Sequence, residues 1–240
     1  LYNIVDRIYI GHIPDTGAMA LTGVGVCMPL IMIITAFAAL VGNGGAPRAT
    51  IFMGKNKKDD AEKILANCFT MQILLSIVLT VVLLIWNRDF LLAFGASANT
   101  IEYASSYMNI YALGTIFVQL TLGMNAFITA QGFAKEGMLS VLIGAIANII
   151  LDPIFIFGLH MGVRGAALAT VISQCCSCIW VISFLFGKRT TLRIRGKNMG
   201  LKAAYILPCL ALGSAFLIMQ GSETFISVSY KSSLLKNGGH

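Results

Sequence analysis

The stretch AIANIILDPIFIF, residues 145–157, places an amide and a carboxylate inside an otherwise apolar segment. Asn148 and Asp152 are four positions apart, so a helix puts both side chains on one face. Pro153 has no backbone N–H, so the carbonyl oxygen of Ile149 loses its helical donor and adds a third oxygen to that face. Because an ionisable group at membrane depth is costly, this stretch predicts a functional site within a membrane helix.

The composition of the whole chain indicates an integral membrane protein. Of its 240 residues, 57% are hydrophobic and 11% are charged, and the mean hydropathy is +0.82. Soluble domains carry about 25% charged residues. Five segments without Asp, Glu, Lys or Arg reach the roughly 20 residues that a membrane helix needs. They are Thr16–Pro47, Ile64–Asn87, Tyr103–Ala134, Gly165–Gly187 and Ala203–Ser222.

Two further segments complete the expected set of spans. Gly137–Phe157 is interrupted only by Asp152, and Leu1–Ile10 has the composition of the last part of a span. We therefore expect seven helices in an all-α, polytopic bundle. Leu1 lies in an apolar stretch, no Met opens the chain, and the order of a secretory signal is missing, so we expect a partial polypeptide.

The basic residues predict the orientation of the bundle, because short loops rich in Lys and Arg stay in the cytoplasm. With the loop after the second span inside, the start of the chain comes from the cytoplasmic side. The net charge of +7 then reflects topology and attraction to anionic lipid rather than nucleic acid. Twelve of the 17 basic residues lie on the predicted inner side: Arg48, Lys55, Lys57, Lys58, Lys63, Lys135, Lys188, Arg189, Arg193, Arg195, Lys197 and Lys202.

The cysteines favour helix packing over a metal site. Cys175 and Cys178 have the CxxC spacing, but no second Cys or His pair follows nearby in the sequence. Small polarisable side chains pack well between membrane helices. We therefore expect neither zinc nor a resident cofactor, and no disulfide framework. All six cysteines fall in expected spans: Cys27, Cys68, Cys175, Cys176, Cys178 and Cys209.

Polar residues on three expected spans share one depth. From the helical rise, Asp6, Asp152 and Thr170 each lie about 7–9 Å below the outer end of their helix. If their spans are neighbours, these three residues and Asn148 converge in the outer half of the bundle. Such a cluster could hold a proton or a sodium ion. A structural alternative places Asp6 near the interface, paired with a neighbouring polar group.

The segment GNGGAP, residues 42–47, is a candidate flexible point near the inner end of the second span. Glycine and proline weaken a helix, and broken helices are typical of transporters. A tight packing seam of small residues explains the same pattern equally well. The candidate hinge positions are Gly42, Gly44, Gly45, Pro47 and Pro153, whereas Gly114 and other isolated glycines are interpreted as packing positions.

Four blocks, in order, carry a family resemblance: LYNIVDRIYIGHI (1–13), VGNGGAPRATIFMGKNKKDDAEKI (41–64), QGFAKEGM (131–138) and NIILDPIFIFGLHMGVRGAALATVIS (148–173). They resemble the multidrug and toxic compound extrusion (MATE) family, close to its bacterial MepA-like branch. The resemblance implies twelve helices in two six-helix lobes. Residues 1–200 would form the N-terminal lobe with an incomplete first helix, and residues 201–240 the first helix of the second lobe.

The resemblance also implies a function. Members of the family export cationic, amphipathic drugs from the bacterial cytoplasm by antiport against protons or sodium ions. The family's N-lobe cation site corresponds to Asp6, Asn148, Asp152 and Thr170. The missing C-terminal lobe and the lipid bilayer are the implied partners, and no enzymatic motif is present. Two alternatives stay open: a flippase for lipid-linked oligosaccharides, and a non-transporting membrane remnant.

Overall fold

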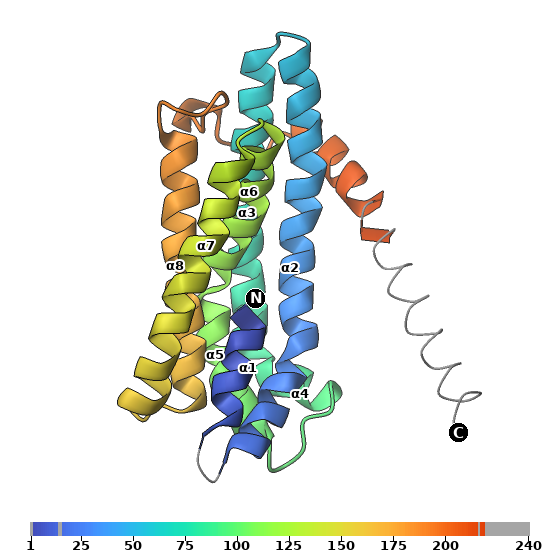
Figure 1. The fold of residues 1–240 in the computed structure, drawn as a ribbon. Coiled ribbons are helices and arrows are strands. Elements are labelled where there is room, and N and C mark those ends of the chain that lie inside the picture. The colour runs from blue at the N-terminus through green and yellow to red at the C-terminus, as the bar shows by residue number, and fades with distance from the viewer. Residues whose placement is uncertain (1, 14–15, 216, 219–240) are drawn as a thin grey trace, which may run out of the picture.

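The computed structural model describes residues 2–13, 16–215 and 217–218, and every regular element in these ranges is helical (Figure 1). This confirms the expected all-α fold. The α-helices are α1 (Tyr2–Gly11), α2 (Gly17–Gly54), α3 (Lys58–Ile85), α4 (Asn87–Ala93), α5 (Ile101–Leu113), α6 (Thr115–Ala130), α7 (Ala134–Pro153), α8 (Val163–Phe186) and a further helix, Ala203–Ala215. A π-helical turn, η1 (Ile154–Gly158), follows α7, and a 3-10 turn, η2 (Gly196–Asn198), lies between α8 and the helix Ala203–Ala215.

Four helices of the described chain are long and apolar enough to cross a membrane: α2, α3, α7 together with η1, and α8. The pair α5 and α6 makes a fifth span if it is counted as one. The other two expected spans correspond to α1 and to the helix Ala203–Ala215, which are shorter as described. Residues 216 and 219–222 of Ala203–Ser222, and most of the segment assigned to a second lobe, lie outside the described residues.

The stretch Tyr103–Ala134, which we expected to form one helix, is divided between two helices. The helix breaks at Gly114, and α5 and α6 meet there with a bend of 57°. A Cβ atom at Gly114 would lie 2.5 Å from Cγ2 of Val171 on α8, so the close approach of α8 requires glycine at this position. Glycine is also a poor helix former, and an isolated apolar stretch does not reveal a bend that a neighbouring helix imposes.

The segment Gly42–Pro47 forms part of an unbroken α2, which runs seven residues past Pro47. Its glycines allow close helix contacts: Gly42 lies against Gly123 of α6, and Gly45 against Cys68 and Phe127. Gly44 faces the backbone of Cys209 in the helix Ala203–Ala215. The packing interpretation therefore accounts for these contacts, and a hinge at this point stays a prediction.

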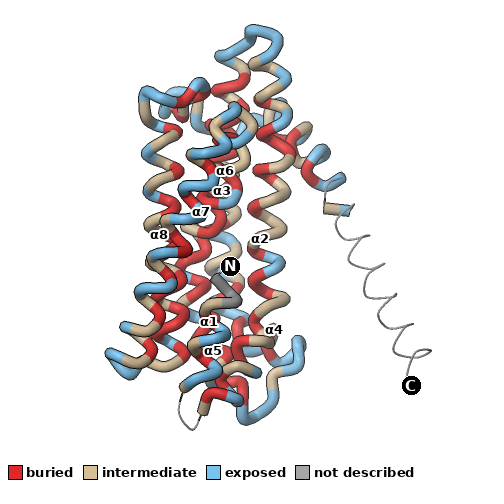
Figure 2. Tube along the Cα trace, viewed as in Figure 1, coloured by how far each residue is buried: buried red, intermediate tan, exposed pale blue. Residues whose placement is uncertain are grey.

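The core consists of two apolar clusters along the bundle axis. One surrounds Ile34 and Tyr107, and the other surrounds Leu65 and Phe127. Figure 2 shows the buried positions on the helix faces that look toward one another. Large apolar side chains on the outward faces are exposed, such as Val78 of α3, which is 57% exposed. An exposed apolar surface of this kind is what a lipid-facing bundle presents.

Two buried glutamines tie α2 to its neighbours. Gln72 of α3 donates to the carbonyl oxygen of Ala38 at 3.0 Å, and Gln119 of α6 donates to that of Ile34 at 2.8 Å. Both side chains are 0% exposed. These bonds fix α2 against α3 and α6 at successive turns, because Ile34 and Ala38 are four residues apart.

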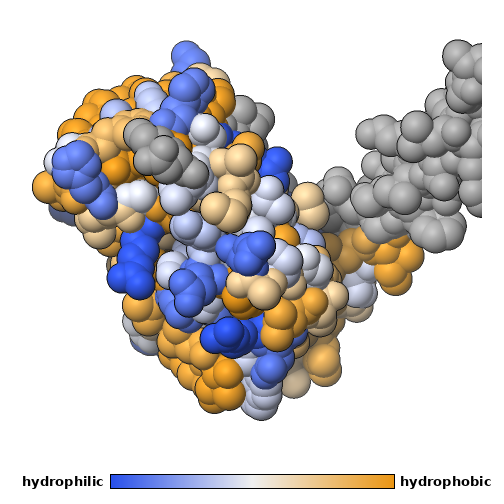
Figure 3. Space-filling view, turned by 90° about the horizontal axis from the view of Figure 1, so that it is seen from below, coloured by the Kyte–Doolittle hydropathy of each residue, from blue (hydrophilic) through white to orange (hydrophobic). Residues whose placement is uncertain are grey.

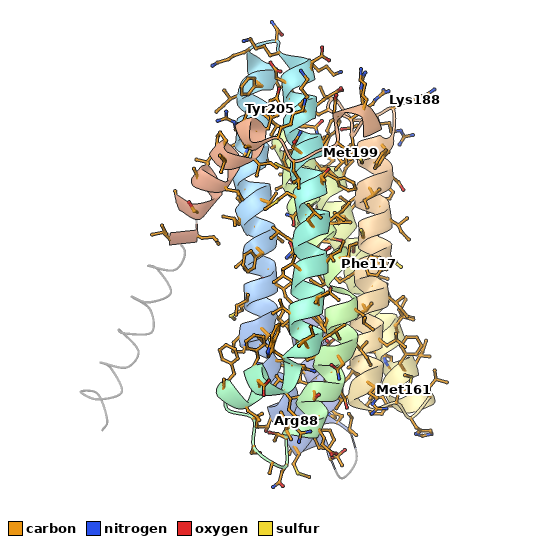
Figure 4. The ribbon with its side chains drawn as sticks, turned by 180° about the vertical axis from the view of Figure 1, so that it is seen from behind. Arg88, Phe117, Met161, Lys188, Met199 and Tyr205 are labelled. Atoms are coloured by element: carbon orange, nitrogen blue, oxygen red, sulfur yellow. The ribbon has the colours of Figure 1, made fainter. Side chains whose placement is uncertain are left out.

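The segment 187–202 is anchored across one end of the bundle. Glu62 of α3 is 1% exposed, and its Oε2 lies 2.8 Å from Nε of Arg195. The Oε1 atom of Gln131 accepts hydrogen bonds from the hydroxyl of Thr190 at 2.9 Å and the backbone N–H of Leu192 at 2.7 Å. Figure 4 places Lys188 and Tyr205 at this end and Arg88 and Met161 at the opposite one.

Candidate buried carboxylate site

The chain folds so that α1, α7 and α8 lie against one another. Asp6 is on α1, Asn148 and Asp152 are on α7, and Thr170 is on α8. The first three side chains are 0% exposed and Thr170 is 1% exposed. The four residues assigned from the sequence therefore come together at one buried point between three helices.

Hydrogen bonds connect all four side chains. The amide of Asn148 is central: its Nδ2 atom lies 3.1 Å from Oδ1 of Asp6, 3.2 Å from Oδ1 of Asp152 and 3.4 Å from Oγ1 of Thr170. The hydroxyl of Thr170 donates to Oδ2 of Asp6 at 2.8 Å. The carboxyl groups of Asp6 and Asp152 also lie within hydrogen-bonding reach of each other. Because Asn148 and Asp152 are one helical turn apart, α7 presents both to the same partner.

Tyr107 is a member of the site that the sequence did not reveal. It lies on α5, is 0% exposed, and donates its hydroxyl hydrogen to Oδ2 of Asp6 at 2.9 Å. Its ring stacks on that of Tyr111 with centroids 6.0 Å apart. The two tyrosines are four residues apart in a segment without charged residues, so the sequence indicates that one helix face carries two hydroxyls. It does not indicate that Asp6 is the partner of either.

Within the described residues, neither Asp6 nor Asp152 has a Lys, Arg or His nitrogen within 4.0 Å. Asp6 instead accepts hydrogen bonds from Tyr107, Asn148 and Thr170. Oδ2 of Asp152 and Oδ1 of Asn148 are buried and have no hydrogen-bond partner. The site therefore lacks two things: hydrogen-bond donors for two buried oxygens, and a positive charge near the two carboxyl groups.

Pro153 marks the point at which α7 changes its helical form. The α-helix ends at this residue, and the π-helical turn Ile154–Gly158 follows directly. The backbone N–H of Leu159 then donates to the carbonyl oxygen of Ile154, five residues earlier, at 2.8 Å. A proline and a wider helical turn next to a buried carboxylate are typical of functional sites in helices.

The side chains of the site are of the kind that can bind a proton or a small hard cation. Carboxylate, amide and hydroxyl oxygens are the ligands that hard cations take in proteins. A proton placed between the two carboxyl groups would supply a donor that the described residues lack. Together, the fold and this cluster define a polytopic helical membrane protein with a buried acidic site in its bundle.

Comparison with known proteins gives the family. The model of the MatE family matches residues 1–154, which is more than half of the chain, so the protein belongs to the MatE family. The multidrug export protein MepA of Staphylococcus haemolyticus is 29% identical over 220 residues, which cover 91% of this chain and 48% of that protein. MepA of Staphylococcus aureus strain NCTC 8325 is 27% identical over 77% of this chain.

Solved structures agree with this assignment. A crystal structure of MATE in the bent conformation superposes with a TM-score of 0.89 and 26% identity, over 98% of this chain and 52% of that one. The chain thus spans about half the length of the relatives that it matches. It is a multi-pass membrane protein of a transporter family, not an enzyme family.

Proposed function

We propose that the protein acts in secondary active multidrug efflux, by antiport of cationic, amphipathic compounds against protons or sodium ions. The names of the relatives support multidrug export, since both are multidrug export proteins. The observation that carries the proposal is the pair Asp6 and Asp152, both fully buried and without a basic partner among the described residues. A bound proton or cation offsets the cost of holding this pair away from water.

The two carboxyl groups differ in how far the protein satisfies them. Asp6 accepts three hydrogen bonds, whereas Asp152 accepts one, from Asn148, and keeps Oδ2 unpartnered. The coupling ion therefore binds at Asp152, with Oδ1 of Asn148 as a further ligand, and Asp6 supplies the second negative charge. Tyr107 and Thr170 orient Asp6 from two other helices.

Ion binding can drive transport only if the ion prefers one conformation of the protein over another. The site joins α1, α5, α7 and α8, so loading or emptying it changes the contacts of four helices at once. Loading draws these helices together and expels the drug, and emptying on the other side restores the drug-binding state. Export also requires the lobe that relatives carry beyond the length matched here.

The proposed location is the bacterial cytoplasmic membrane, with the start of the chain on the cytoplasmic side. Its support is the distribution of charge. The twelve basic residues lie at one end of the bundle: in residues 48–63 around the α2–α3 turn, at Lys135 near the start of α7 and in the segment 187–202. Short basic loops stay in the cytoplasm.

The test is drug efflux from energised membrane vesicles that contain the full-length protein. Asp152→Asn should lower the ion-driven rate at least about tenfold, because it removes one charge from the site. Asp89→Asn, which changes an exposed acid on α4, is the matched control and should leave the rate unchanged. Proton and sodium gradients are imposed separately to identify the ion. An Asp152→Asn variant with normal rate and normal gradient dependence would overturn the site assignment.

A further inference from the structure

A pocket of about 380 Å³ opens at the end of the bundle opposite to the segment 187–202. It is separate from the buried carboxylate site, none of whose five residues lines it. Figure 3 shows strongly hydrophilic residues gathered over the middle of this end, with apolar residues toward the margin. The lining comes from three places, the end of the α1–α2 connection, α5 and the turn into α8: Ile13, Thr16, Glu102, Tyr103, Ser106, His160, Met161, Gly162, Val163 and Arg164.

The pocket contains a carboxylate and a guanidinium that are not paired with each other, together with the imidazole of His160. Glu102 and Arg164 both line it, and among the described residues neither takes part in an ion pair or a side-chain hydrogen bond. Both side chains are exposed. A free carboxylate and a free guanidinium in one cavity can each bind an opposite charge on the same ligand.

Apolar and aromatic groups line the same pocket. Tyr103, Ile13, Met161 and Val163 contribute apolar surface, and Val163 is 6% exposed. Tyr103 and Glu102 line the same pocket, so the ring of Tyr103 can take part in a cation–π contact with a cation bound there. The volume falls in the range of about 300–1,000 Å³ that is typical of small-molecule sites.

The turn that forms one wall is held in an unusual backbone conformation. His160 has φ 52°, in the left-handed region that side chains other than glycine rarely adopt, and Gly162 has φ 56°. Such a conformation is unfavourable and persists only where the surrounding structure fixes it. The backbone N–H of Met161 donates to the carbonyl oxygen of Phe155 at 3.1 Å, which fixes the turn. The wall is therefore preformed.

We propose that this pocket binds amphipathic zwitterions, with the ligand's carboxylate on Arg164 and its ammonium group on Glu102. Arginine suits the carboxylate because its planar guanidinium binds two oxygens at once. The apolar body of the ligand lies against Tyr103, Met161 and Val163. This site goes beyond the proposed antiport, and its ligand class is dipolar rather than cationic.

The test is equilibrium binding to the purified protein in detergent, so it does not depend on transport. The probe is Nε-dansyl-lysine, which carries an ammonium group, a carboxylate and a fluorescent apolar body. Its methyl ester keeps only the ammonium group, and its Nα-acetyl derivative keeps only the carboxylate. The protein should bind the zwitterion about tenfold or more tightly than either derivative, since each derivative loses one charge-assisted contact.

Three variants separate the two contacts. Arg164→Gln should remove the preference over the ester and keep the preference over the acetyl derivative, and Glu102→Gln should do the reverse. Arg164→Lys keeps the charge but loses the two-oxygen contact, so it should bind the zwitterion more weakly than the unmodified protein and more tightly than Arg164→Gln. Arg88→Gln changes an exposed arginine at the same end, outside the pocket, and should leave all affinities unchanged. Equal affinity for the three compounds, signals equal to those of empty micelles, or equal losses in the Arg88 and Arg164 variants would overturn the proposal.

Discussion

The hydroxyl of Tyr107 should stabilise the folded protein through its hydrogen bond to Asp6. The perturbation is Tyr107→Phe, which removes one oxygen and keeps the ring that stacks on Tyr111. The lost bond has a donor–acceptor distance of 2.9 Å and is fully buried. A hydrogen bond to a charged group contributes about 1.5–3 kcal/mol to stability. That range changes the unfolding equilibrium constant about 10- to 150-fold.

The matched control is Tyr111→Phe. Tyr111 is 4% exposed and lies one helical turn away on the same face of α5, and among the described residues its hydroxyl has no hydrogen-bond partner. Removal of that hydroxyl should change the free energy of unfolding by no more than about 0.5 kcal/mol. The comparison therefore isolates the bond to Asp6 from the packing of two tyrosine rings.

The assay is reversible unfolding of the protein in mixed micelles, followed by the intrinsic fluorescence of its two tryptophans. A double-mutant cycle with Asp6→Leu completes the measurement: once the carboxylate is gone, Tyr107→Phe should have little further effect, with a coupling energy of about 1–3 kcal/mol. Equal losses from the Tyr107 and Tyr111 variants, or a coupling energy near zero, would refute the reasoning.

Two further predictions concern the contacts that hold the helix Ala203–Ala215 and the segment before it. Gly44→Ala should lower the free energy of unfolding by about 1–3 kcal/mol, because the added methyl group meets the backbone of Cys209. Gly54→Ala should leave the free energy of unfolding unchanged, because nothing lies within 4 Å of the added methyl group. Thermal unfolding of both variants checks this. Arg195→Ala leaves the buried carboxylate of Glu62 without its 2.8 Å partner. Since Arg195 is 45% exposed, we expect a loss of about 1–2 kcal/mol and faster proteolysis of the segment 187–202, and normal resistance to protease would contradict the role of this pair.

Local regularities explain what could be read from the chain. Hydropathy is a property of contiguous residues, so it predicted a helical membrane bundle before any contact was known. The spacing of Asn148 and Asp152 fixed their shared face, because a helix repeats every 3.6 residues. The depth of Asp6 and Thr170 followed from helical rise alone. Together these rules assembled four members of the site from three helices.

The bend at Gly114 and the contacts of Gly42 and Gly45 could not be read in this way. The residues around a glycine in an apolar segment do not indicate whether it lies at a helix bend, at a close helix contact or at neither. At Gly114 the neighbour is the side chain of Val171 on α8. On α2, Gly42 contacts Gly123 and Gly45 contacts Phe127. The same holds for Glu62, which follows a run of charged residues in the sequence and is buried in the structure, beside Arg195.

The sequence by itself determined the class of protein, the helices that carry the acidic site and the level at which that site lies, because these depend on short-range periodicity and on the cost of charge in an apolar solvent. Only the tertiary structure decided that Tyr107 binds Asp6, across 101 positions, that α5 and α6 part at a bend, and that Glu102 and Arg164 share one pocket. These features depend on which helices pack together, and sequence spacing carries no information on contacts between distant segments.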